Sequence, residues 1–352
     1  MTEGFRWCPH CRTPHGLNER VCRNTGQRLD GAFDPRPPKV QAPTGPRFEG
    51  LVLDGKYRLL RQIGAGGVGK VFEAENLEAG RMVAIKLVGR NAQPATFVRL
   101  VREARLVSGI KHPNICEVHD VGKMPDGSPF VVFERLFGET LAERTRGVLQ
   151  LPVGAAIDLF LQLLVGLEAA HQARIIHRDL KPQNVFLVDR PDGGPILKIL
   201  DFGFAQDLAA TTRITRPGDA CGTLQYMSPE QLRVEPLDPR SDLFAVGVML
   251  YEALAGRHPF VATSPIELQM NILRTAPAPL RARRPDVSEA LVDVISRALE
   301  KDPAKRPASA AAFHRDLVNL ARARQPLPSF ADQEPPSMTE PVWLAPTTTP
   351  PA

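Results

Sequence analysis

The feature that most constrains the fold is the order of sequence patterns between two Pro-rich regions. From about residue 51 to residue 323, short strand-like apolar runs come first and longer helical patterns come later, without an internal repeat. On either side, residues 34–50 and 325–352 are rich in Pro and cannot sustain helical or strand periodicity. We therefore expect one α+β domain over 51–323, preceded by a linker at 31–50 and followed by a disordered tail at 324–352.

The composition is that of an ordinary globular chain, with 43% hydrophobic and 24% charged residues. A net charge of +5 over 352 residues is modest, so it predicts neither nucleic-acid binding nor attachment to an acidic membrane. No uninterrupted apolar run approaches the ~20 residues of a membrane helix, and the N-terminus has no apolar signal core. Five Cys do not make a disulfide framework in a chain this long. We expect a cytoplasmic protein.

A Gly-rich loop opens the domain. Residues 63–71 read IGAGGVGKV, in which Gly64, Gly66 and Gly69 form a G-x-G-x-x-G pattern. Because Gly has no Cβ, such a loop lets backbone N–H groups approach phosphate oxygens. Hairpins without ligands and dinucleotide-binding folds share this spacing, so the elements that follow must distinguish between these possibilities. The chain continues as a strand rather than opening a helix, and then reads VAIK at residues 83–86. A Lys at the end of an apolar run could simply mark a strand edge, but its place after a Gly-rich loop favours a phosphate-binding lysine.

Two further segments place a carboxylate base and metal-binding oxygens in a short stretch of chain. Residues 177–184 read HRDLKPQN and residues 201–203 read DFG. Both match motifs of protein kinases, and a whole octet followed by DFG could hardly arise by chance. The chain resembles a bacterial eukaryotic-like (Hanks-type) Ser/Thr protein kinase, and the resemblance covers about three quarters of it.

The resemblance implies a bilobal fold, with a small antiparallel β lobe carrying one regulatory helix and a large, mainly helical lobe. It also implies the roles of four residues in the transfer of a phosphoryl group from ATP. Asp179 would accept or orient the proton of the substrate hydroxyl, and Lys181 would steady the moving γ-phosphoryl group. Asn184 and Asp201 would hold Mg²⁺, with Mn²⁺ as an alternative metal, on the β- and γ-phosphate oxygens.

The regulatory helix is expected at residues 95–110, where apolar residues recur with helical spacing. Glu103 projects from the border of this apolar stripe, where its carboxylate could reach Lys86. An ordinary exposed acid would satisfy the same pattern. The order of motifs favours an ion pair that holds Lys86 against the α- and β-phosphates.

The resemblance also places the adenine site. Residues 129–136, PFVVFERL, resemble the strand that leads into the hinge, with Phe133 as gatekeeper. Backbone groups of Glu134 and Leu136 would bind the edge of the ring. The faces of the ring would be covered by Ile63, Val71, Ala84 and Phe186, although core packing alone would also explain these apolar residues. Thr140 stands where many relatives carry an acid for the ribose.

The segment from 204 to 230 resembles an activation loop, and it ends in a peptide-docking stretch in which Ser228 replaces the more familiar Ala. Threonines in its middle are Thr211, Thr212 and Thr215. We expect autophosphorylation in trans within a transient homodimer, with Thr215 as the favoured acceptor and Arg178 pairing the phosphate. Unmodified loop threonines are the alternative. The resemblance further implies that Asp242 braces the catalytic loop, and a structural ion pair is expected in the large lobe between Glu230 and Arg306.

The first part of the chain poses a separate question. Three cysteines crowd into it: Cys8, Cys11 and Cys22. The first two have the C-x-x-C spacing of a zinc knuckle, and the third begins a similar turn whose last Cys is replaced by Thr25. Either His10 or His15 supplies a fourth ligand, or the segment is a degenerate zinc ribbon without metal. We expect a zinc-ribbon-like docking or regulatory module over residues 5–30.

Two classes of function remain. The first is an ATP-dependent Ser/Thr kinase that acts on proteins in intracellular signalling. The second is a scaffold whose kinase fold binds nucleotide and partners without useful turnover. The expected residues at positions 86, 179, 184 and 201 favour the kinase. Phosphoryl transfer to small molecules is disfavoured by the peptide-docking stretch.

Overall fold

The computed structural model forms two compact units, residues 1–48 and 49–352. It describes residues 5–7, 14–16, 48–66, 69–88, 101, 104–146, 150–190, 194–202 and 224–324. In the first unit, strand β1 (Phe5–Trp7) pairs antiparallel with β2 (Pro14–Gly16), so that Trp7 lies opposite Pro14. The second unit contains two sheets and all of the described helices.

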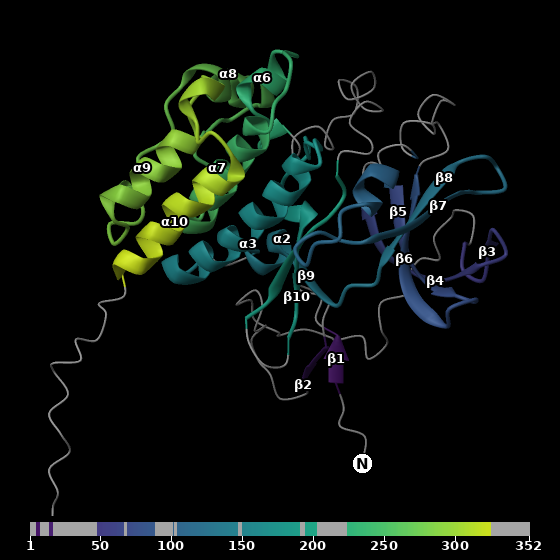
Figure 1. Cartoon of the computed structure of the whole chain (residues 1–352). Helices are drawn as coiled ribbons and strands as arrows, with labels where there is room; N and C mark the ends of the chain where they lie inside the picture. The colour runs from purple at the N-terminus through teal and green to yellow at the C-terminus, as the bar shows by residue number, and fades with distance from the viewer. Residues whose placement is uncertain are drawn as a thin grey trace, which may run out of the picture. The chain divides into compact units, whose positions relative to one another are not determined.

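A six-stranded antiparallel sheet forms the β lobe of the second unit (Figure 1). Its strands are β3 (Val52–Leu53), β4 (Tyr57–Gly66), β5 (Gly69–Asn76), β6 (Arg81–Val88), β7 (Val118–Lys123) and β8 (Pro129–Glu134). They lie in the order β3-β4-β5-β6-β8-β7. Side chains alternate between the two faces of a strand. In β6, Val83 and Ile85 are therefore buried in the core of the lobe, while Ala84 and Lys86 share the opposite, partly exposed face.

The Gly-rich loop is the hairpin between β4 and β5. Gly66 lies opposite Gly69 at its end. A Cβ atom at position 69 would lie only 2.0 Å from the backbone oxygen of Leu87 in β6. The third glycine of the motif is therefore required by close packing of β5 on β6, in addition to any role toward phosphate.

The helix expected at residues 95–110 is described only in its second half. Residues 104–108 are helical, and Ala104 and Val107 are buried, as their spacing predicts. Residues 89–100 and Glu103 lie outside the described part of the chain.

A smaller sheet lies beside the catalytic segments. Strands β9 (Gly138–Thr140), β10 (Val185–Val188) and β11 (Ile196–Ile199) have the order β11-β10-β9. A short 3-10 helix, η1 (Pro182–Asn184), leads directly into β10. Chain order therefore places the HRDLKPQN motif immediately before β10 and the DFG motif immediately after β11.

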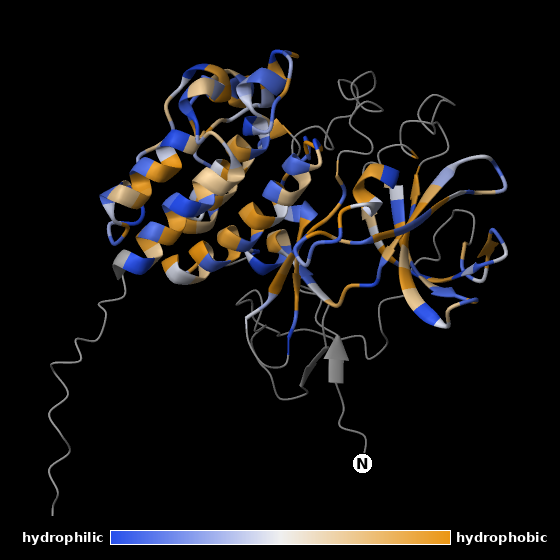
Figure 2. Cartoon of the chain, viewed as in Figure 1, coloured by the Kyte–Doolittle hydropathy of each residue, from blue (hydrophilic) through white to orange (hydrophobic). Residues whose placement is uncertain are grey.

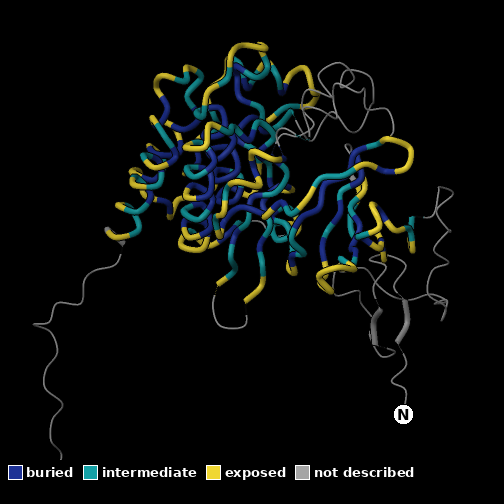
Figure 3. The backbone as a smooth tube through the Cα atoms, turned by 45° about the vertical axis from the view of Figure 1, so that its right-hand side comes forward, coloured by how far each residue is buried: buried dark blue, intermediate teal, exposed yellow. Residues whose placement is uncertain are grey.

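The large lobe is built of helices packed around α7 (Arg240–Ala255). The others are α2 (Leu141–Arg144), α3 (Val153–Gln172), α6 (Pro229–Leu232), α8 (Pro265–Arg274), α9 (Glu289–Ala298) and α10 (Ala310–Arg324). In α7, every residue except Arg240 and Glu252 is buried. Figure 3 shows buried residues gathered in the interior of the helical lobe, and Figure 2 shows hydrophobic and hydrophilic residues alternating along its helices.

Helix α3 is long and apolar enough to cross a membrane by length and composition alone. Half of its most apolar stretch is buried inside the fold, and it packs against α7, α10 and β11. A core helix of a globular lobe satisfies the same criteria. Its apolar character is therefore explained by its place in the lobe.

Candidate active site

One buried carboxylate from α7 holds the backbone of the catalytic loop. Asp242 is 1% exposed and accepts hydrogen bonds from the backbone N–H groups of His177 and Arg178, at 2.8 and 2.9 Å. The ring of His171 in α3 lies 2.8 Å from the same carboxylate. Burial alone would raise the pKa of Asp242, but the contacts with His171 and His177 hold that pKa below its usual value.

The backbone of Arg178 is strained. Its φ of 65° lies in the left-handed region, which costs a residue with a Cβ roughly 1–3 kcal/mol. Such a conformation persists only where surrounding contacts determine it. The bond to Asp242 supplies one such contact, and the strained peptide directly precedes the proposed base, Asp179.

Three of the predicted catalytic-loop residues converge on one another. The Nζ atom of Lys181 lies 2.8 Å from a carboxylate oxygen of Asp179. The side-chain amide of Asn184 donates to the backbone oxygen of Asp179 at 2.7 Å. All three side chains are mostly removed from solvent, so their mutual orientation is fixed before any ligand binds.

Across the site, Lys86 of β6 pairs with Asp201. The distance from its Nζ to a carboxylate oxygen of Asp201 is 2.8 Å. Asp201 has a φ of 49°, a second left-handed residue at the site. The predicted partner of Lys86, Glu103, lies outside the described residues, so that ion pair remains a prediction.

The side-chain oxygen atoms of Asn184 and Asp201 suit a hard metal cation. Among the described residues, the amide nitrogen of Asn184 is committed to Asp179 and one oxygen of Asp201 to Lys86. The amide oxygen of Asn184 and the second oxygen of Asp201 are left as ligands. Oxygen donors of this kind fit Mg²⁺, which prefers a few carboxylate and amide oxygens together with water and phosphate.

A pocket lies between the β lobe and the smaller sheet. It is lined by Ile63, Val71, Ala84, Lys86, Cys116, Phe133, Glu134, Arg135, Leu136, Phe186, Leu200 and Asp201. All four side chains predicted to cover the faces of the adenine ring are among them, as are the predicted gatekeeper and hinge residues. A largely apolar cleft that ends at Lys86 and Asp201 can hold a planar base with its phosphates toward the charged end.

Sequence reasoning missed three of the pocket residues. The sequence indicates Cys116 only as a core residue, and it gives Arg135 and Leu200 no place in the pocket. Cys116 is buried, and burial raises the pKa of its thiol well above the usual range, so it lines the pocket as a small apolar residue. Only its position directly after the HPNI stretch could have indicated this place.

Charged side chains tie the hinge to strands on both of its sides. Arg135 donates to Glu73 of β5 at 2.8 Å and to the backbone oxygen of Leu136. The hydrogen bond from Arg135 lowers the pKa of Glu73 against the effect of burial. Glu134 accepts a bond of 2.6 Å from Lys198 of β11, and its backbone N–H donates to the backbone oxygen of Glu117 at 3.0 Å, so that N–H group is already engaged within the protein.

Thr140, the residue at the predicted ribose position, caps helix α2. Its side chain accepts a hydrogen bond from the backbone N–H of Glu143, and its own backbone N–H donates to the carboxylate of Glu143. This is a complete capping box, which fixes the start of the helix. The hydroxyl also donates to Glu143.

His177 and Phe202 belong to the core. Their ring centres are 4.9 Å apart. His177 is fully buried, and its Nε2 atom lies 2.8 Å from the backbone oxygen of Leu200. These contacts pack the HRD and DFG motifs against each other.

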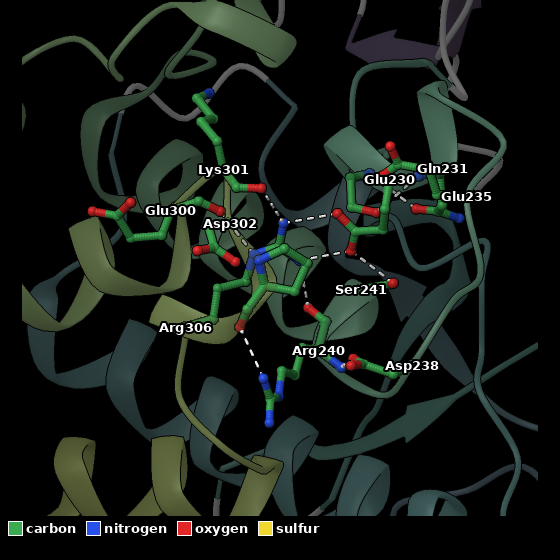
Figure 4. Close-up of polar contacts among 12 residues, drawn as sticks. Glu230, Gln231, Glu235, Asp238, Arg240, Ser241, Glu300, Lys301, Asp302 and Arg306 are labelled. Atoms are coloured by element: carbon green, nitrogen blue, oxygen red, sulfur yellow. Dashed lines mark hydrogen bonds and ion pairs between the residues drawn. The ribbon is translucent and has the colours of Figure 1, made fainter.

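The predicted ion pair of the large lobe is present. Arg306 donates two hydrogen bonds to Glu230, at 2.7 and 2.8 Å, and both residues are buried. Ser241 donates to the same carboxylate, and backbone oxygens of Glu300, Arg240 and Lys301 accept from Arg306. Figure 4 shows these groups converging on the guanidinium group of Arg306. The pair joins α6 to the chain before α10.

Some predicted residues lie outside the described part of the chain. They are Glu103 and the threonines Thr211, Thr212 and Thr215, together with Cys8, Cys11 and Cys22. Their roles remain predictions.

The family follows from comparison with known proteins. The family described as "Protein kinase domain" matches residues 57–318, which contain the whole site. The chain therefore belongs to the protein kinase family, a family that uses ATP and Mg²⁺.

Its relatives are bacterial Ser/Thr kinases. Serine/threonine-protein kinase pkn3 of Myxococcus xanthus is 38% identical over 297 residues, covering 82% of this chain and 54% of pkn3. Pkn1 of the same organism is 40% identical over 321 residues, covering 90% of this chain and 45% of Pkn1. The crystal structure of the Mycobacterium tuberculosis PknI kinase domain has a TM-score of 0.62 and 27% identity, covering 77% of this chain and 98% of that domain. The chain spans about half the length of these curated relatives.

Proposed function

We propose that this protein is an ATP-dependent Ser/Thr protein kinase that transfers the γ-phosphoryl group of ATP to hydroxyl groups of proteins. The observation that carries the proposal is the convergence of Lys181 and Asn184 on Asp179. These are the side chains that a phosphoryl acceptor, a γ-phosphate and a metal would each need. The Ser/Thr kinases among its relatives support the same activity.

In the proposed reaction, the oxygen of an acceptor Ser or Thr attacks the γ-phosphorus atom. The bond from that phosphorus to the bridging oxygen of the β-phosphate breaks, ADP leaves, and the hydroxyl proton passes to the carboxylate of Asp179. Lys181 neutralises charge on the transferred group, and Lys86 orients the α- and β-phosphates. Mg²⁺, held by Asn184 and Asp201, would neutralise charge on the β- and γ-phosphate oxygens.

The test is to incubate the full chain with Mg²⁺ and ATP labelled in the γ-phosphate, beside an Asp179→Asn variant. We expect label on the chain and on a basic protein acceptor, with loss of at least about a hundredfold in the variant, because proton transfer contributes about 10²–10⁴-fold. A folded wild-type protein that binds ATP and transfers no label would instead indicate a nucleotide-binding scaffold.

We further propose that the enzyme works in the cytoplasm, bound to neither nucleic acid nor membrane, and modifies its own activation loop within a transient homodimer. The support is the run of threonines in that loop, Thr211, Thr212 and Thr215, with Thr215 favoured. Mapping of phosphopeptides from the active enzyme tests this. If none of the three threonines carries phosphate, the proposal of autophosphorylation there is wrong.

For the first unit, we propose a zinc-ribbon-like module at residues 5–30, joined by the linker at 31–50 to a kinase domain at 51–323, with a disordered tail at 324–352. The antiparallel pairing of β1 with β2 on either side of the C-x-x-C segment supports a knuckle-like turn there. Cys8, Cys11 and Cys22 would be zinc ligands. Metal analysis of the purified protein tests whether zinc is bound, and we expect one zinc per chain.

A further inference from the structure

We propose that Gln231 is a positioning residue for the catalytic base, through a hydrogen bond that fixes the strained peptide before Asp179. The inference rests on the proposed kinase activity and adds a residue from α6 that none of the matched motifs contains. The side chain of Gln231 forms hydrogen bonds with the backbone of Ser228 and of Arg178, so its effect would be exerted through the backbone of the catalytic loop.

Gln231 first takes part in the cap of α6. Ser228 is the residue before the helix, and its hydroxyl accepts from the backbone N–H of Gln231 at 3.4 Å. In return, the backbone N–H of Ser228 donates to the side-chain oxygen of Gln231 at 2.9 Å. This reciprocal capping box explains why Ser at this position is more than a neutral replacement for Ala.

The other end of the same amide reaches the catalytic loop. Nε2 of Gln231 donates to the backbone oxygen of Arg178 at 2.6 Å, between residues 53 positions apart in sequence. The N–H of Arg178 is held by Asp242 from α7. The left-handed residue is therefore fixed at its N–H by one helix and at its C=O by another.

The capping box does not require Gln. At α2, Thr140 forms the equivalent box with a glutamate, Glu143, in the same third position. A carboxylate accepts hydrogen bonds but has no proton to donate when ionised. The amide nitrogen of Gln231 therefore has one use that a glutamate could not supply, namely the bond to Arg178.

The arrangement also connects two parts of the site. Ser228 and Gln231 lie at the end of the stretch that resembles the peptide-docking segment, and α6 is joined to the core by the pair of Glu230 with Arg306. A shift of α6 would therefore be transmitted to the peptide before Asp179. The amide of Gln231 therefore connects the end of the docking segment to the loop that carries the base.

The substitution that isolates this bond is Gln231→Glu. It keeps the size of the side chain and the acceptor of the capping box, but it removes the donor and places a carboxylate against the Arg178 oxygen. We expect kcat to fall at least about tenfold, because small displacements of catalytic groups cost that much or more. We expect KM for ATP to change less than about twofold and the melting temperature to stay within a few degrees of that of the wild type.

Gln150→Glu is the matched control. Gln150 also donates its amide to a backbone oxygen, that of Arg283 at 3.1 Å, in an exposed part of the large lobe remote from the motifs. The same chemical change there should leave kcat unchanged. A second variant, Ser228→Ala, removes the hydroxyl of the cap while leaving the bond from Gln231 to Arg178, and it should lower stability more than kcat.

The pH dependence of kcat provides a further test. If Gln231 only stabilised the fold, the ratio of wild-type to variant kcat would not depend on pH. As pH falls toward the pKa of the introduced carboxyl group, its protonated form regains a donor, so the ratio of wild-type to Gln231→Glu kcat should narrow. If the wild type is active and the folded Gln231→Glu protein matches it at every pH, the inference is wrong. If the wild type itself transfers no phosphate, the proposed kinase function is wrong, and with it the proposed role of Gln231.

Discussion

Lys301 is a half-buried lysine whose Nζ atom is removed from solvent and has no hydrogen-bond partner among the described residues. Its Nζ atom lies 3.8 Å from the centre of the Phe260 ring, and an aromatic face favours the charged form. Burial and the neighbouring charge of Arg306 act in the opposite direction and lower its pKa to about 8. Burial therefore dominates, and the charge at this position costs stability.

We predict that Lys301→Met raises the free energy of unfolding at pH 7 by about 1 kcal/mol, allowing for solvent that partly screens the penalty. The unfolded chain keeps a pKa near 10.5. Since the unfolded state then binds more protons between pH 8 and 10.5, the wild type gains stability as pH rises through this range, and the advantage of the variant shrinks. Denaturant titrations at several pH values measure this.

Lys305→Met, at an exposed lysine of the same segment, is the control and should change stability little at any pH. A Lys301→Met protein that is less stable than the wild type at pH 7 would show that the aromatic contacts outweigh burial.

At the scale of elements, the buried pair of Glu230 and Arg306 joins α6 to the segment before α10. Breaking a buried pair leaves one charge without compensation, which typically costs about 4 kcal/mol. We predict a loss of this size for Glu230→Gln, measured by denaturant unfolding. Glu235→Gln breaks an exposed pair with Arg233 and should cost less than about 1 kcal/mol. Equal losses in the two variants would contradict the argument.

The same pair has a defined pH dependence. Burial works to raise the pKa of Glu230, but Arg306 holds that pKa below its usual value. A depressed pKa in the folded state stabilises the protein above the unfolded value and loses that effect as pH falls through the folded pKa. The difference in stability between wild type and Glu230→Gln should therefore be constant above about pH 5 and narrow in acid.

The elements of the site could largely be predicted from the sequence, because local patterns encode them. The apolar spacing within residues 95–110 correctly placed Ala104 and Val107 in the core, and the motif spacing placed Asp179, Lys181 and Asn184 together correctly. Contacts between distant segments could not be predicted. The bond from Gln231 to Arg178 and the pair of Arg135 with Glu73 join residues 53 and 62 positions apart, and no periodicity specifies them.

At the scale of the whole molecule, the pocket lies between strands of the β lobe and the smaller sheet, whereas the loop that carries the base is held by α6 and α7 of the large lobe. The hinge between them is short and charged, with Arg135 bound to Glu73 on one side and Glu134 bound to Lys198 on the other. Both pairs are largely removed from solvent. Motion of one lobe relative to the other must therefore rotate about a segment whose side chains are anchored to strands of each.

The buried carboxylate of Asp242 also affects how the protein unfolds. Because α7 is enclosed on nearly all sides, the loop that it holds cannot open locally while the large lobe stays folded. The amide protons of His177 and Arg178 should then exchange with solvent only through global unfolding, as slowly as those of α7 itself. On heating, the proposed kinase activity and the fold of the large lobe should be lost together, so that at no temperature should the lobe be folded while the protein is inactive.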